Sequence, residues 1–350
     1  MKIIHVTAST QYDVKIGNGL LTHLGEEIPN VCKVGKAAII SDSNVWPLHG
    51  EAAAASLQDA GYAVVHYAFP AGEESKNGET YLEILNFLAE NHITRSDCIV
   101  ALGGGVVGDI AGFAAATYLR GIAYIQVPTT LLAAVDSSVG GKTAIDLKSG
   151  KNLAGAFYQP RLVLCDTDLL QTLPKEIFRD GCAEVIKYGV LYDDALFSYL
   201  MAHGLDFDRE TVIARCVELK RNVVAQDEFD TGERQKLNLG HTIGHAMEAL
   251  SNFNISHGQA VAIGTAIVTA ASVKYGICGI GTLEQILAIL EKFQLPCAAS
   301  YNAQMLFDAA LSDKKRLGTS VTLVVPERIG SCILRPTPVE KLKDFIEAGL

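Results

Sequence analysis

The sequence predicts an α/β protein with an N-terminal Rossmann-like parallel-sheet domain and a mostly α-helical C-terminal domain. The chain has 350 residues, about the length of two domains. In its first half, short β-branched runs alternate with helical segments, which is typical of a parallel sheet covered on both faces. After about Gln171 long helical segments replace this alternation. We therefore place the two domains at residues 1–172 and 173–350.

The strands of the first domain are predicted where apolar and β-branched residues cluster over a few positions. These clusters are Lys2–Thr7, Tyr12–Ile16, Ala37–Ser41, Ala63–Ala68, Cys98–Leu102, Ala123–Val127 and Leu162–Cys165. Helices are predicted between them at Leu20–Ile28, Pro47–Ala60, Thr80–Asn91 and Ile110–Leu119. In the second domain only Val321–Val325 is predicted as a strand, so its core must be built mainly from helices.

The composition indicates a folded, acidic protein. Apolar residues make up 49% and charged residues 19%, which excludes a disordered chain. The formal net charge of −10 argues against nucleic acid and membrane surfaces as partners, since both are anionic. The eight cysteines form no C-x-x-C pair and several lie in apolar runs, which favours a reducing cytoplasm. We interpret the weakly polar stretch Ile255–Val273 as a buried helix and not as a membrane span.

A glycine-rich turn follows the predicted strand Cys98–Leu102. Gly103, Gly105 and Gly108 form G-x-G-x-x-G, a pattern in which backbone N–H groups can meet a pyrophosphate at a helix N-terminus. A tight strand-to-helix turn without a ligand is an equal alternative. The usual acidic residue about twenty positions later is missing, which disfavours a plain Rossmann dehydrogenase. The segment 41–44, after another predicted strand, is the candidate for holding the ribose.

A second glycine-rich segment, Asp136–Asn152, carries three lysines in an otherwise acidic chain. Lys142, Lys148 and Lys151 lie among glycines that permit close backbone approach, which suits a phosphate or carboxylate. It is not a Walker loop, because Asp136 stands where that motif requires glycine. A solvated lysine loop is the alternative.

Histidines cluster in the C-terminal half. His241 and His245 are four residues apart and therefore share a helix face, and His257 follows. Together with Glu184, which lies in an otherwise apolar helical segment, they predict a catalytic zinc site of two or three imidazoles and one carboxylate. Spacing alone favours His241 and His245 as the ligand pair, and buried structural histidines are the alternative.

The ordered motifs resemble the sugar phosphate cyclase family, and within it the members that form 3-dehydroquinate. The resemblance covers residues from about Tyr12 to Gly330. The matching stretches are Pro70–Lys76, Gly103–Asp109, Tyr118–Gly121, Pro128–Thr130, Asp136–Asn152, Ala183–Gly189, Leu237–His245, His257–Gly258 and Asp313–Lys315. One departure is Asp230, where the family pattern has Glu.

This resemblance implies a bound NAD, one zinc ion with cobalt as an alternative, and a role for each matching residue. The implied metal ligands are Glu184, His241 and His257, so that His245 becomes a substrate-side acid/base residue. The implied NAD contacts are Asp42, Asn44, Glu73, Lys76, Gly104, Gly105, Asp109, Thr129, Thr130, Asp136, Lys142, Lys151 and Thr172. A phosphate clamp is implied at Lys142, Asn152, Arg120, which would reach across a homodimer, and one of Lys314 or Lys315. The substrate carboxylate and hydroxyls would be held by Lys187, Lys220, Arg234 and Asn238, with Asp136 between cofactor and substrate.

The implied reaction converts 3-deoxy-D-arabino-heptulosonate 7-phosphate, a phosphorylated sugar acid, to 3-dehydroquinate and phosphate in the shikimate pathway of aromatic amino acid biosynthesis. NAD would accept a hydride from carbon 5, phosphate would leave by elimination, the hydride would return, and an aldol closure would form the ring. Cyclases for 2-deoxy-scyllo-inosose and 2-epi-5-epi-valiolone are disfavoured because Arg234, Asn238 and His245 are all present. A polyol dehydrogenase is disfavoured by the phosphate clamp, and a non-catalytic NAD sensor would leave the metal ligands idle.

Overall fold

The computed structural model describes residues 1–252, 254–298, 300–314 and 319–350, without the side chains of 312–314. The chain divides into two compact units. The first unit comprises Met1–Pro174 and Arg209–Phe229, and the second comprises Lys175–Asp208 and Asp230–Leu350. Whereas the sequence predicts one boundary after residue 172, the chain leaves the first unit after Pro174 and returns to it for one further helix.

The first unit is built on a seven-stranded sheet with the order β1-β2-β9-β6-β5-β3-β4. Its strands are β1 (Lys2–Val6), β2 (Tyr12–Gly17), β3 (Lys36–Asp42), β4 (Ala63–Phe69), β5 (Cys98–Gly103), β6 (Ala123–Pro128) and β9 (Leu162–Asp166). All seven predicted strands are therefore confirmed within one residue at each end. The predicted parallel sheet is confirmed, with one antiparallel pairing at its edge between β1 and β2. Only a few residues join these two strands, and a parallel crossover needs a much longer connection.

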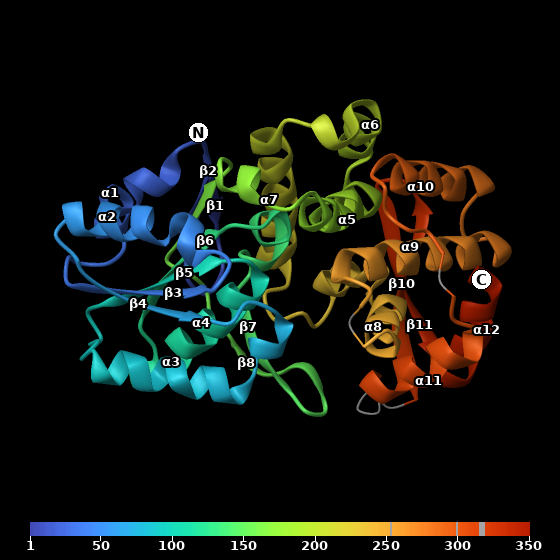
Figure 1. Ribbon diagram of the computed structural model, residues 1–350. Helices are drawn as coiled ribbons and strands as arrows, with labels where there is room; N and C mark the ends of the chain where they lie inside the picture. Colours follow the sequence, from blue (N-terminus) through green and yellow to red (C-terminus); the bar gives the residue numbers. More distant parts are fainter. Residues whose placement is uncertain (253, 299, 315–318) are drawn as a thin grey trace. The chain divides into compact units, whose positions relative to one another are not determined.

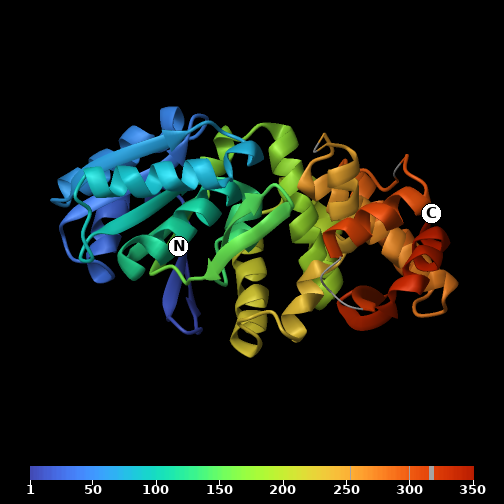
Figure 2. The ribbon, with the colours of Figure 1, turned by 90° about the horizontal axis from the view of Figure 1, so that it is seen from below.

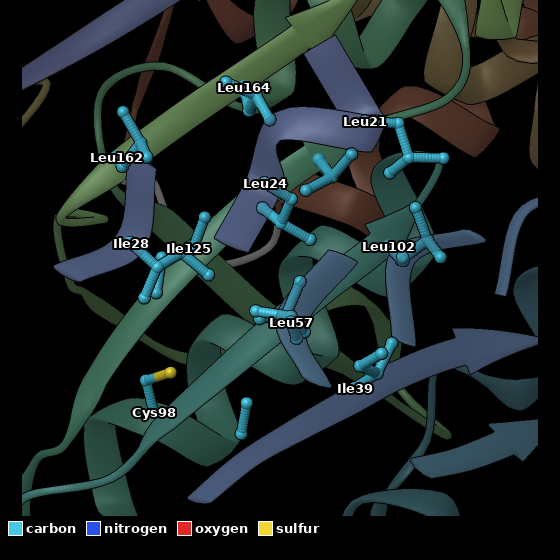
Figure 3. Close-up of a cluster of buried hydrophobic side chains, with 14 of the residues drawn as sticks. Leu21, Leu24, Ile28, Ile39, Leu57, Cys98, Leu102, Ile125, Leu162 and Leu164 are labelled. Atoms are coloured by element: carbon cyan, nitrogen blue, oxygen red, sulfur yellow. The ribbon is translucent and has the colours of Figure 1, made fainter. Parts of the chain in front are cut away.

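Helices cover both faces of this sheet (Figure 1). One face packs against α1 (Leu24–Glu27) and α2 (Glu51–Asp59), and the other against α3 (Gly78–Glu90) and α4 (Gly105–Thr117), which Figure 2 shows from below. Successive residues of β5 alternate between the two cores, with Val100 in the first and Ile99 in the second. Figure 3 shows the first core, where Leu24 and Leu57 meet strand residues such as Ile125. This burial on both faces explains the continuous apolar runs in the sequence.

Two further elements complete the first unit. The antiparallel hairpin of β7 (Lys142–Leu147) and β8 (Gly150–Phe157) includes the three lysines of the second glycine-rich segment, for which no strand was predicted. Helix α7 (Arg209–Gln226) packs on β1, on β2 and on the helical turn Ala133–Ser137. The predicted helix Ile110–Leu119 begins earlier than expected, at Gly105, and ends at Thr117.

The second unit is mainly helical, as predicted. Its helices are α5 (Lys175–Tyr192), α6 (Asp194–His203), α8 (His241–Leu250), α9 (His257–Lys274), α10 (Ile280–Lys292), α11 (Ala303–Lys314) and α12 (Val339–Gly349). An antiparallel hairpin of β10 (Ser320–Arg328) and β11 (Ser331–Pro338) packs with them, and β11 was not predicted. Helix α9 is buried along most of its length, which confirms the interpretation of Ile255–Val273. Among the described residues, no helix combines the length and apolar character needed to cross a membrane.

Candidate active site

Three helices of the second unit bring Glu184, His241 and His257 together. Glu184 lies in the middle of α5, His241 is the first residue of α8, and His257 is the first residue of α9. Nε2 of His257 lies 3.0 Å from Oε1 of Glu184, and Nε2 of His241 lies 3.4 Å from the same oxygen. The three ligand atoms all lie within 4.8 Å of one another. Two imidazoles and a carboxylate in this arrangement match the ligand set of a catalytic zinc site.

Close helix packing fixes where these histidines lie. Gly240, just before His241, has φ +78°, and a Cβ there would lie 2.5 Å from the carbonyl oxygen of Val261 on α9. At the start of α9, Asp180 of α5 accepts hydrogen bonds from the Ser256 hydroxyl and, at 3.1 Å, from the backbone N–H of Gln259. Asp180 lies one helical turn before Glu184, so α5 both supplies one ligand and anchors the helix that carries another.

In both rings Nδ1 contacts a neighbouring oxygen and Nε2 faces Glu184. Nδ1 of His241 lies 2.9 Å from the carbonyl oxygen of Leu239, which can only accept, so Nδ1 carries a proton and Nε2 is the nitrogen that faces Glu184. Nδ1 of His257 faces the carboxylate of Glu248 at 3.5 Å. Such outer hydrogen-bond partners are typical of histidines that bind metals, so these residues fit a zinc or cobalt ion.

Charge around the site favours an ionised Glu184. Burial by itself would raise the pKa of Glu184, but Lys187 and the two histidines outweigh it and hold the pKa well below its usual range. Nζ of Lys187 lies 2.5 Å from Oε2 of Glu184, and both side chains are 2% exposed. Burial lowers the pKa of His241, although Glu184 opposes this shift. For His257 burial also favours a lower pKa, but its bonds to Glu184 and Glu248 raise the pKa to about 10.

The other residues predicted for the site in this unit include His245, Arg234 and Asn238. His245 is exposed on α8, and its ring centroid is 5.5 Å from that of His241. Its ligand atoms group instead with those of Glu248 and His257. The group around Glu184 contains His241 and His257, so it differs from the pair His241 and His245 that spacing alone favours. Arg234 is 1% exposed in the 3-10 helix Glu233–Asn238, which also carries Asn238. Lys315 lies outside the described residues, as does the side chain of Lys314.

In the first unit, the predicted nucleotide residues gather at the carboxyl ends of neighbouring parallel strands. Strand β3 pairs with β4 on one side and β5 on the other, so the strand order reverses direction there, which is where open α/β sheets bind nucleotides. Asp42 ends β3, and its Oδ1 accepts the backbone N–H groups of Asn44 and Val45 at 2.8 and 2.9 Å. Gly104 and Gly105 follow β5, and Thr129 and Thr130 follow β6.

The start of α4 is suited to bind an anionic group. Gly104 precedes the helix without a side-chain cap, which leaves its first N–H groups available. A Cβ at Gly104 would lie 2.9 Å from Cγ2 of Thr130. The hydroxyls of Thr129 and Ser137 are buried, and no hydrogen-bond partner lies near them among the described residues. Orphaned hydroxyls beside a glycine turn fit a bound dinucleotide.

The buried Lys76 is the centre of a polar network in this unit. Its Nζ lies 2.7 Å from Oδ2 of Asp109 and 2.6 Å from Oδ1 of Asn152, and it is 3.8 Å from Oε1 of Glu73, which Lys151 approaches to 3.7 Å. Burial would lower the pKa of Lys76, but Asp109 and Glu73 outweigh it and raise the pKa. The network therefore joins four predicted NAD residues to Asn152 of the predicted phosphate clamp.

The remaining predicted residues of the first unit are more widely distributed. Lys220 on α7 donates to the backbone carbonyl of Asp136 at 2.6 Å and also pairs with its carboxylate. Thr172 meets Nε2 of His49 at 3.0 Å. Arg120 is exposed after α4, and Lys142 is exposed at the start of β7.

Sequence reasoning missed two carboxylates that support the histidine cluster. Glu248 follows His241 by seven residues, a helical spacing that places both on one face of α8. Asp180 precedes Glu184 by four residues in the same way on α5. Both spacings were visible in the sequence, but neither indicates which neighbouring helix the side chain meets.

Comparison with known proteins gives consistent matches. Residues 66–180 match the family model described as 3-dehydroquinate synthase N-terminal, and residues 181–316 match the one described as 3-dehydroquinate synthase C-terminal. A 3-dehydroquinate synthase of Pelobacter propionicus is 46% identical, with 95% of this chain and 94% of that protein covered. One of Streptococcus suis is 41% identical, with 99% and 100% covered.

Solved structures of related cyclases share the fold. A 2-deoxy-scyllo-inosose synthase complexed with carbaglucose-6-phosphate, NAD+ and Co2+ matches with a TM-score of 0.90 and 27% identity over all of both chains. A 2-epi-5-epi-valiolone synthase from Streptomyces hygroscopicus with NAD+ and Zn2+ bound matches with a TM-score of 0.89 and 25% identity, covering 99% of this chain and 97% of that one. A glycerol dehydrogenase from Schizosaccharomyces pombe, at 17% identity and a TM-score of 0.66, shares the fold only and covers 96% and 88%.

Proposed function

Since this chain belongs to the 3-dehydroquinate synthase family, we propose that it converts 3-deoxy-D-arabino-heptulosonate 7-phosphate to 3-dehydroquinate and phosphate, using NAD and zinc. The observation that carries the proposal is the group Glu184, His241 and His257, since its two imidazoles already direct Nε2 toward one carboxylate. The inosose and valiolone synthases are less similar, at 27% and 25% identity, than the relatives named 3-dehydroquinate synthase.

Glu184, His241 and His257 would hold the metal, and Lys187 would keep the carboxylate ionised. When bound, the metal would acidify a substrate hydroxyl and NAD would take up and return a hydride. Solved relatives contain Co2+ or Zn2+, and the two imidazoles with one carboxylate suit either ion, with zinc our choice. His245, exposed beside these ligands, would move a proton at the substrate.

In the first unit, the carboxyl ends of β3, β5 and β6 would hold NAD. Asp42 and Asn44 would face the ribose, while the N–H groups that begin α4 and the orphaned hydroxyl of Thr129 would meet the pyrophosphate. The Lys76 network would fix the neighbouring wall through Asp109 and Glu73. The other implied NAD contacts are Gly104, Gly105, Thr130, Asp136, Lys142, Lys151 and Thr172.

Basic and amide side chains would recognise the two anionic ends of the substrate. Lys142, Asn152, Arg120 and Lys314 or Lys315 would bind the phosphate, and Arg234 with Asn238 would bind the carboxylate and hydroxyls together with Lys187 and Lys220. A planar guanidinium such as Arg234 suits a carboxylate because it donates two parallel hydrogen bonds. A neutral polyol would need no such charge, which is why we prefer the cyclase to a polyol dehydrogenase.

We propose further that the protein is a cytoplasmic homodimer. Arg120 is exposed, so it is available to reach the site of a second copy. Seven of the eight cysteines are buried, as expected for thiols kept in a reducing compartment. Light scattering tests the dimer, and a mixture of Arg120→Ala chains with chains inactivated at His245 tests whether Arg120 acts in trans, since mixed dimers would then regain activity at one of their two sites.

One assay separates the proposed activity from that of a dehydrogenase. Zinc-loaded protein is mixed with catalytic NAD and the heptulosonate phosphate, and phosphate release and NADH absorbance are followed together. Phosphate release without net NADH supports the cyclase, because the hydride is borrowed and returned. Steady NADH growth without phosphate, or activity only with glycerol, would contradict the proposal.

A further inference from the structure

Glu248 lies on the far side of the His257 ring from Glu184. Oε2 of Glu248 is 3.5 Å from Nδ1 of His257, while Oε1 of Glu184 is 3.0 Å from Nε2 of the same ring. Glu248 is 3% exposed, and a carboxylate so deeply buried is costly unless it is paired. Its position on α8 therefore ties that helix to the first residue of α9.

The two histidines of the site differ in how their Nδ1 atoms are held. His241 meets a backbone carbonyl two residues away, so its own helix start fixes its ring. His257 begins α9, where Ser256 and Gln259 form the cap and Asp180 anchors the backbone. Those contacts fix the backbone of the helix start, whereas the His257 ring itself is held at Nε2 by Glu184. Glu248 is the acceptor that faces its Nδ1.

We propose that Glu248 is a positioning residue, which holds Nδ1–H of His257 and thereby directs Nε2 toward the metal. This inference rests on the metal site proposed above and adds a residue to it. Removing a carboxylate that orients a metal-bound histidine typically costs about 10- to 100-fold in metal affinity. Glu248 does not itself bind the metal in this arrangement.

A second metal ion is the alternative use of the same atoms. His245, Glu248 and His257 also offer ligand atoms within 4.8 Å of one another. A metal at that point would need the lone pair of Nδ1 of His257, and a neutral ring that binds metal through Nε2 has its proton there. The proposal therefore requires one ion per chain.

The test measures cobalt binding instead of turnover. Metal-free wild type, Glu248→Gln, Glu248→Met and Ser272→Ala are titrated with Co2+, and the visible spectrum gives both affinity and ligand geometry. We expect Glu248→Met to raise Kd about 10- to 100-fold and to alter the spectrum. Glu248→Gln should restore most of the affinity, because its amide oxygen still accepts from Nδ1–H. Ser272 is buried on α9 about 22 Å from His257, so its variant should match wild type.

Three results would overturn the proposal. The first is a Glu248→Met variant whose Kd and spectrum equal those of the wild type. The second is the binding of two ions per chain. The third is a proton on Nε2 of His257 in nitrogen-15 spectra of the zinc-loaded wild type. The last measurement stands even if Glu248→Met does not fold. His257→Ala separates the two proposals: if it keeps wild-type affinity, the ligand set is wrong, whereas lost affinity there with no effect of Glu248→Met rejects only the role of Glu248.

Discussion

The sharpest prediction concerns Gly258, which follows His257 and contacts no metal itself. A Cβ at this position would lie 2.0 Å from the carbonyl oxygen of Asp180 on α5 and 2.7 Å from its carbonyl carbon. Both atoms belong to helix backbone, which cannot rotate away as a side chain can. Gly258→Ala must therefore push the start of α9 away from α5, and His257 moves with it.

The size of the effect follows from the overlap. Real Cβ contacts are essentially never shorter than 3.0 Å, so the helix start must move by about 1 Å from the present 2.0 Å. Metal–ligand distances tolerate only about 0.2 Å. We expect the zinc affinity of Gly258→Ala to fall at least tenfold, and overpacking to lower the free energy of unfolding of the metal-free protein by about 1–3 kcal/mol.

Zinc affinity is measured by competition with a chromophoric chelator, and stability by thermal unfolding without metal. Gly281→Ala is the matched control, because in the described part of the chain nothing beyond its chain neighbours and its own helix backbone lies within 4 Å of a Cβ at this position near the start of α10. It should keep the wild-type affinity and gain about 0.4–1 kcal/mol in stability. If Gly258→Ala bound zinc as tightly as wild type and melted at the same temperature, the packing argument would be wrong.

Three other predictions use different parts of the molecule. Lys76→Met removes the paired cation from the partly buried Asp109 and should cost about 1–3 kcal/mol in urea unfolding, while adding Asp109→Asn should recover part of it; additive losses would contradict the pairing. For Asp97, burial favours a higher pKa, but hydrogen bonds from Lys36 and Thr94 lower it, so its stabilising contribution is present at neutral pH and lost as pH falls through that depressed pKa. Asp97→Asn should then flatten the acid limb of the stability profile, and an unchanged limb would count against this assignment. Arg234→Ala should raise the Michaelis constant for the carboxylated substrate about 10- to 100-fold, whereas equal rates at low substrate would reject its role.

The sequence predicted the inner strands of the large sheet well because β3, β5, β6 and β9 are buried on both faces and appear as continuous apolar runs. The hairpin β7–β8 escaped prediction because its two strands pair only with each other and much of β8 is half exposed. Strand β11 contains Pro336 and Pro338, which oppose a strand assignment except at an edge, and a two-stranded hairpin consists of edges. The apolar pattern of a strand does not show whether it runs parallel or antiparallel to its neighbour, which is why the antiparallel pairing of β1 was not predicted.

For the candidate site, residue types were easier to predict than their grouping. Helical spacing relates residues of one helix, so it linked His241 to His245. The group in the structure takes one residue from each of three helices, and only the packing of α5, α8 and α9 brings Glu184 and His257 to His241. The resemblance supplied that set, whereas Asp180 and Glu248 support it through contacts between helices that no local pattern encodes.

The return of α7 to the first unit has a consequence for synthesis on the ribosome. Residues up to Pro174 contain every strand of the large sheet, yet the helix that packs on β1 and β2 is translated only later, at Arg209–Gln226. At a synthesis rate of about 5–20 residues per second, β1 and β2 are complete several seconds before α7 can pack on them. Lys175–Asp208 are also synthesised before the rest of the second unit, which begins only at Asp230. A fragment that stops at Pro174 should therefore aggregate more readily than one that continues to Phe229.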